Sequence, residues 1–265
     1  MTFALVLALT VLGCFLLRRP IAAHPGLLYG FALVVDGAYL AADFFGAPYW
    51  LWAPLFVLVQ KCLLALALFT VVMYIGCFSR ASRVSFWLRP VRAELSIAAC
   101  LLAAGHMAAY LGTYVSQLAM GSARANVAVA FAVALGLLVL LLVLGVTSLH
   151  VVKRRMSAER WRRVQAWAYP FFGLVYVHLA LMLAPAAAGG GASAQESLAV
   201  YTAVFGVYAV ARVARALADR RPAHEECAPA GVEGAVVCGQ SAVGVEVPGD
   251  GEHSGELGEE VSVFA

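Results

Sequence analysis

The sequence predicts an all-α integral membrane protein, a bundle of seven transmembrane helices. Of its 265 residues 63% are hydrophobic and 12% are charged, whereas a soluble domain carries about 25% charged residues. Its mean hydropathy is +0.87. The apolar residues also fall into blocks, and most of these blocks are long enough for the roughly 20-residue helix that crosses a bilayer.

Seven apolar segments follow one another along the chain. The first, 2–17, could be mistaken for a signal peptide, but its basic residues Arg18 and Arg19 come after the apolar run rather than before it, so we interpret it as a helix. The remaining segments are 26–46, 54–77, 94–115, 126–150, 164–184 and 198–216. Residues 222–265 contain acids and glycines but no Lys or Arg, which predicts a disordered acidic tail.

The basic residues predict the orientation of the bundle. All Lys and Arg residues except Lys61 and Arg124 lie at the end of, or after, the first, third, fifth or seventh apolar segment. Since cytoplasmic loops are enriched in basic residues, we expect the N-terminus outside and the C-terminal tail in the cytoplasm, with the chain crossing the cell (plasma or inner) membrane several times. The positive charge is thus a topology signal, and it does not indicate nucleic-acid binding.

Two histidines lie deep within apolar segments, where an unpaired polar ring is costly and therefore suggests a function. His106 is 12 residues and His178 is 14 residues from the expected cytoplasmic end of its segment. At 1.5 Å per residue both lie roughly 18–21 Å from that surface, in the outer half of the membrane. Equal depth on two helices favours axial ligation of one haem. The alternative is a small-residue helix–helix contact with a hydrogen-bonded histidine.

Lys61 is the only lysine or arginine that lies inside an apolar segment away from the segment's ends. Its ammonium could bind a haem propionate, or it could snorkel outward or pair with Asp36 or Asp43 of the preceding segment. These two acids are seven residues apart and share a helical face, where they could also serve proton transfer near a quinone. The cysteine spacings argue against covalent c-type haem and a structural zinc site.

At this point the sequence resembles a known family. Trp161, Tyr169 and His178 after Thr147-Ser148, and the stretch Leu88–Arg92 leading to His106 and Tyr110, resemble the ferric reductase-like transmembrane domain family. The resemblance is nearest to the haem-binding membrane subunit of the periplasmic methionine sulfoxide reductase system. It covers about residues 26–216 and implies a six-helix haem-binding domain over 26–221, preceded by an extra helix and basic loop over 1–25. It also places Lys61 on the family's basic position.

The chain departs from the family pattern at the inner haem. Gln165 stands where the family has its first histidine, and the corresponding positions before His106 are Arg92 and Ala93. We therefore carry over only the outer haem b, bound by His106 and His178, and consider a second, inner haem doubtful. His150 could rescue an inner site.

The resemblance implies an electron-transfer subunit of an oxidoreductase rather than a complete enzyme. A single outer haem suits electron transfer from quinol, or from a donor flavin such as FMN, to an extracytoplasmic reductase or redox protein. The only soluble segment is the short tail, so we expect the partner enzyme to be another polypeptide. The alternatives are a haem-free membrane protein with a transport or assembly role, and a surface ferric-chelate reductase.

Overall fold

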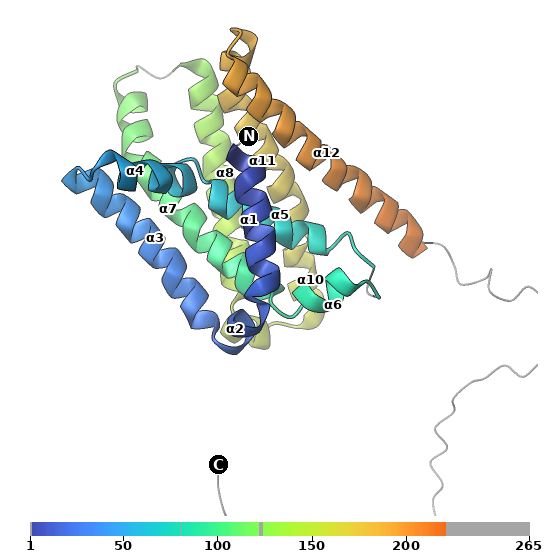
Figure 1. The fold of residues 1–265 in the computed structure, drawn as a ribbon. Coiled ribbons are helices and arrows are strands. Elements are labelled where there is room, and N and C mark those ends of the chain that lie inside the picture. The colour runs from blue at the N-terminus through green and yellow to red at the C-terminus, as the bar shows by residue number, and fades with distance from the viewer. Residues whose placement is uncertain (1, 80, 122–123, 221–265) are drawn as a thin grey trace, which may run out of the picture. The chain divides into compact units, whose positions relative to one another are not determined.

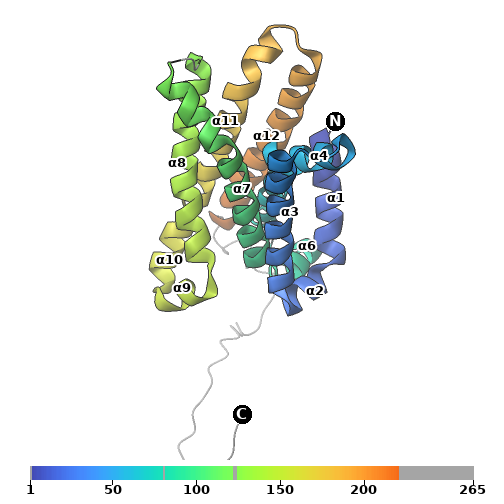
Figure 2. The same cartoon turned by 90° about the vertical axis from the view of Figure 1, so that its left-hand side faces the viewer.

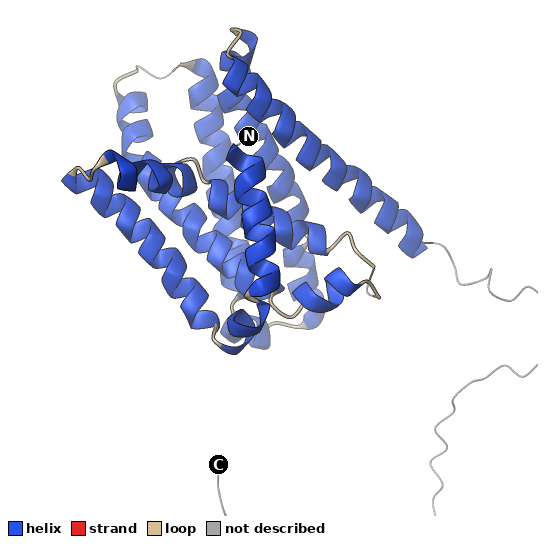
Figure 3. Ribbon diagram, in the orientation of Figure 1, coloured by secondary structure: helices blue, strands red, loops and turns tan. Residues whose placement is uncertain are grey.

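The computed structural model describes residues 2–79, 81–121 and 124–220, and the expected tail, 222–265, lies outside the described residues. All regular structure in the described part is helical (Figure 3). The helices are α1 (Thr2–Leu16), α2 (Arg18–Ala23), α3 (Pro25–Phe45), α4 (Tyr49–Leu55), the π-helical turn η1 (Phe56–Gln60), α5 (Leu63–Ile75), α6 (Arg83–Leu88), α7 (Arg92–Ala119), α8 (Ala125–Ser148), α9 (His150–Arg155), α10 (Ala158–Gln165), α11 (Ala168–Ala188) and α12 (Ala192–Arg220).

Six helical segments within the described residues are long and apolar enough to cross a bilayer: Pro25–Phe45, Tyr49–Ile75, Arg92–Ala119, Ala125–Ser148, Ala158–Ala188 and Ala192–Asp219. They correspond to the second to seventh apolar segments of the sequence, and they define a multi-pass membrane protein. The first segment forms the 15-residue helix α1. At 1.5 Å per residue α1 spans about 22 Å, less than the roughly 30 Å hydrocarbon core. A seventh crossing and the sidedness of the termini remain predictions.

The two ends of the bundle differ in character. The short helices α2, α9 and α10 lie together at one end, whereas the α7–α8 and α11–α12 connections lie at the other, as does the start of α1 (Figures 1 and 2). We call the first the basic end, because α2, α9 and α10 carry most of its arginines and lysines, joined by those of α6 and the last turns of α12. We call the second the cavity end. The basic residues thus gather at one end, as the alternation in the sequence predicts.

Helix α5 lies at the centre of the packing. Most of its residues from Leu63 to Ile75 are buried, and it packs against α7 and α1, while α11 packs against α12 and α8. The outer faces of the bundle are apolar instead: Leu9 of α1, Val34 of α3, Val139 of α8 and Val210 of α12 are all well exposed. Helices that are apolar all round are typical of a bundle that is surrounded by lipid.

Candidate functional site

A cavity of about 730 Å³ lies at the cavity end of the bundle. Its walls come from α7, α8 and α11, with contributions from the starts of α1 and α12 and from the Gln60–Lys61 segment. Pockets for small ligands and cofactors have volumes of roughly 300–1,000 Å³. His106, His178 and Lys61, the three site residues expected from the sequence, all line this one cavity.

The His106 ring is held by the backbone of a neighbouring segment. Its Nδ1 lies 2.7 Å from the carbonyl oxygen of Gln60. Because a carbonyl can only accept a hydrogen bond, Nδ1 must carry the proton and donate it. A neutral imidazole then has its lone pair on Nε2, the nitrogen that remains able to ligate a metal.

His178 is fixed in the same way from a different helix. Its Nδ1 lies 3.1 Å from the carbonyl oxygen of Ala130 in α8. By the same reasoning Nδ1 donates and Nε2 keeps the lone pair. Two imidazoles, one from α7 and one from α11, therefore line the same cavity in the same tautomer. In each, Nδ1 is hydrogen-bonded to a main-chain carbonyl oxygen.

The Gln60 carbonyl is available because the membrane segment Tyr49–Ile75 is interrupted. Pro54 lies inside α4, the next turn is the π-helical Phe56–Gln60, and Cys62 has a left-handed conformation with φ 56°. The regular i to i−4 bonding resumes with Leu66, whose N–H donates to Cys62. Carbonyls just before the break lose their helical partners, and π-turns and strained residues are often found at functional sites.

Lys61 stands at this break without either of the acids that the sequence offered as partners. Its ammonium lies 5.4 Å from the Phe56 ring centroid, and no described carboxylate lies within ion-pair distance of it. Asp43 instead accepts a hydrogen bond of 3.4 Å from Trp52 Nε1. Asp36 is buried against Gly105, and its Oδ1 has no hydrogen-bond partner among the described residues.

Aromatic rings continue the site along α7. The His106 and Tyr110 ring centroids are 5.1 Å apart, and Tyr110 stacks on Tyr114 at 5.3 Å. Tyr114 in turn approaches Phe131 of α8 at 5.7 Å, and all four rings line the cavity. The spacing of four residues between these α7 rings placed them on one helical face, which the sequence interpretation did not use.

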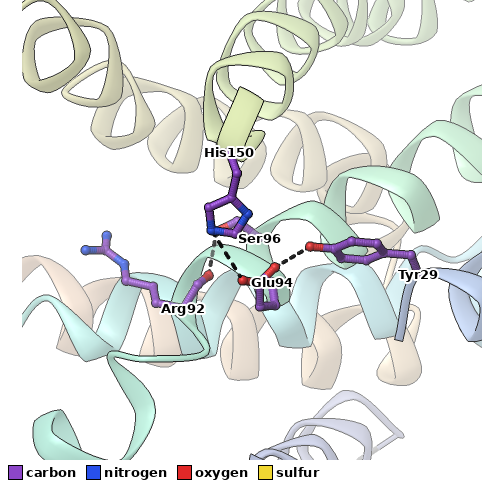
Figure 4. Close-up of polar contacts among 5 residues, drawn as sticks. All are labelled: Tyr29, Arg92, Glu94, Ser96 and His150. Atoms are coloured by element: carbon purple, nitrogen blue, oxygen red, sulfur yellow. Dashed lines mark hydrogen bonds and ion pairs between the residues drawn. The ribbon is translucent and has the colours of Figure 1, made fainter. Parts of the chain in front are cut away.

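Among the described residues, no second pair of histidines lies at the level of Gln165. Gln165 donates to the hydroxyls of Thr147 and Ser148 at 3.1 and 3.4 Å, so its amide serves to fasten α10 to α8. His150 is turned toward Glu94, with its Nε2 3.8 Å from Oε1, and Tyr29 donates to the other oxygen of the same carboxylate (Figure 4). His150 therefore has no partner histidine in the described part of the chain with which it could form an inner haem site.

Taken together, fold and site define a multi-pass membrane protein with a histidine-bearing cavity between its helices. Residues 61–176 match the family model described as ferric reductase like transmembrane component. This segment is therefore supported as a ferric reductase-like transmembrane domain, which suggests a membrane redox protein. The matched range contains Lys61 and His106 and stops two residues before His178.

One relative and one negative result complete the comparison. A protein of Treponema pallidum (strain Nichols), described only as uncharacterized, is 42% identical over 142 residues. The match covers 53% of this chain and 39% of that protein, so the chain spans well under half of the relative's length. No solved structure matches the chain.

Proposed function

We propose that this chain is a membrane b-type cytochrome subunit that binds one haem b through His106 and His178. The observation that carries the proposal is the pair of imidazoles on one cavity, each with Nδ1 bonded to a backbone carbonyl. Such a second contact fixes the orientation of a ligating histidine and raises its basicity. If the histidines served only helix packing, there would be no reason for both rings to form their hydrogen bond through Nδ1 and keep Nε2 available for a metal.

The cavity fits this cofactor in its other properties. Its wall on α8 contains Ala130 and Ala134, whose small side chains leave room for a flat ring between α7 and α11. Lys61, the one lysine of the wall, is suited to bind an anionic propionate. Haem b would supply reversible one-electron transfer there, and the protein sets its position and electrostatic surroundings.

The direction of electron flow follows from the proposed orientation. With the basic end in the cytoplasm, the cavity lies in the outer half of the membrane. That position suits a relay that receives electrons from the quinol pool, or from a donor flavin such as FMN, and delivers them to an extracytoplasmic reductase or redox protein. In the order of its motifs the chain resembles the haem-binding membrane subunit of the periplasmic methionine sulfoxide reductase system.

A haem count and a reduction assay test this function. A pyridine haemochrome measurement on the detergent-purified full chain should give about one b-type haem per chain, and a short-chain quinol should reduce it. Two haems per chain would contradict the single-site account. No haem in a well-folded protein would favour the haem-free transport or assembly role, and reduction of added ferric chelates by the isolated chain would favour a surface ferric reductase.

A further inference from the structure

Three arginines and two tyrosines lie within electrostatic range at the basic end of the bundle, away from the histidine cavity. Arg89 follows α6, Arg92 begins α7, Tyr169 lies in the first turn of α11, and Tyr208 and Arg212 lie on α12. We call these five residues the arginine–tyrosine cluster. None of them has a part in the proposed haem site.

Arg212 is held in this cluster by neutral partners only. Its Nη2 donates to Tyr169 Oη at 2.5 Å, its Nη1 donates to the Gly76 carbonyl at 3.4 Å, and its Cζ lies 4.7 Å from the Tyr169 ring centroid. Other arginines of this end do have acidic partners. Arg163 pairs with Glu159 at 2.8 Å and Arg215 with Asp219 at 2.7 Å. The Arg212 guanidinium has no carboxylate within 4 Å in the described part of the chain.

Arg92 has a nearby acid in sequence but is turned away from it. Figure 4 shows the Arg92 guanidinium pointing away from Glu94, whose carboxylate is engaged by Tyr29 and His150. Arg92 instead lies within electrostatic range of Arg89, Arg212, Tyr169 and Tyr208. Three like charges close together repel one another, and an anion among them would relieve that repulsion.

Two further features of the cluster point to a missing acceptor. The Tyr208 side chain is 8% exposed, and its hydroxyl has no hydrogen-bond partner among the described residues, although a buried polar group is normally paired. Helix α7 also begins here, and its N-cap residue, Val91, does not cap the helix with a side-chain hydrogen bond. The free N–H groups and the dipole of a helix N-terminus favour an anion.

We propose that the arginine–tyrosine cluster binds a phosphate group. Guanidinium groups recognise phosphate through paired N–H donors, and the Tyr208 hydroxyl offers one donor more. Arg89, Arg92 and Tyr169 are exposed, so the cluster is open to a ligand at the membrane boundary. The phosphate comes either from an anionic phospholipid headgroup or from a soluble phosphate, and the two sources are separable by experiment.

The lipid source is tested by native mass spectrometry of the full chain in a non-ionic, phosphate-free detergent. Phosphatidylglycerol is titrated against diacylglycerol, which shares its chains but has no phosphate. The wild type should retain phosphatidylglycerol, and Arg92→Gln and Arg212→Gln should each bind it about ten- to a hundredfold more weakly. Tyr208→Phe keeps the ring packing and should weaken binding about three- to tenfold.

The soluble source is tested by the thermal unfolding of the same proteins with and without inorganic phosphate. Stabilisation of the wild type that is lost in Arg212→Gln would identify a soluble phosphate, and retention of phosphatidylglycerol alone would identify a lipid. The control is Arg162→Gln, which removes an exposed arginine of α10 at the same end. The proposal is overturned if neither probe binds the wild type, or if Arg162→Gln weakens binding as much as Arg92→Gln does.

Discussion

Replacing Gly105 by alanine tests how closely α3 packs against the helix that carries His106. A Cβ built at Gly105 meets the carboxylate carbon and both oxygens of Asp36, all closer than real Cβ contacts ever come. Asp36 is 7% exposed, so the displaced carboxylate has no open solvent to move into. Overpacking of this kind costs about 1–3 kcal/mol. We expect Gly105→Ala to lower the thermal unfolding midpoint of the detergent-solubilised protein.

The same helix offers a matched control. A Cβ at Gly112 of α7 meets nothing within 4 Å, so Gly112→Ala should gain about 0.5–1 kcal/mol from helix propensity alone. Asp36→Ala should relieve the clash, so that the double variant with Gly105→Ala is more stable than the sum of the single effects predicts. If Gly105→Ala proves as stable as Gly112→Ala, the proposed close packing of Asp36 on α7 is wrong.

Three further predictions concern single contacts, each followed by thermal unfolding or haem content in detergent. Tyr29→Phe removes a donor from the buried Glu94 carboxylate and should cost about 1–3 kcal/mol, whereas His150→Ala removes a long, exposed ion pair and should cost under about 1 kcal/mol; equal losses would refute this ranking. Tyr74→Phe breaks a 2.6 Å bond to a backbone carbonyl of α12 and should cost about 0.5–1.5 kcal/mol, and an unchanged midpoint would argue against that bond. Lys61→Met should lower the haem retained per chain while the spectrum of the remaining haem stays the same, and full retention would remove Lys61 from the site.

The sequence was informative where the length of an apolar segment, the position of its basic flank or the constant rise of a helix determined the structure. Apolar runs located the six membrane-long helices, and their basic flanks located the basic end. Counting residues from these flanks also placed His106 and His178 at one level, and both line the same cavity in the structure. Helical rise is nearly constant, so depth could be calculated before any contact was known.

The remaining features depend on contacts that the sequence does not encode locally. The π-turn and the left-handed Cys62 that free the Gln60 carbonyl follow from tertiary packing. The partner of His178 is a backbone carbonyl, at Ala130, and a main-chain acceptor has no sequence signature. The sequence suggested an ion pair between Lys61 and either Asp36 or Asp43. In the structure Asp36 packs on Gly105 instead, a contact that only the three-dimensional arrangement reveals.

The most direct test of the account is the reduced-minus-oxidised absorbance spectrum of the purified protein beside those of His106→Ala and His178→Ala, with His150→Ala as the control. One low-spin b-type haem is expected in the wild type and in His150→Ala, with its low-spin signal lost in either of the other two variants. A low-spin haem that survives both His106→Ala and His178→Ala would contradict the assignment of these two imidazoles as its ligands.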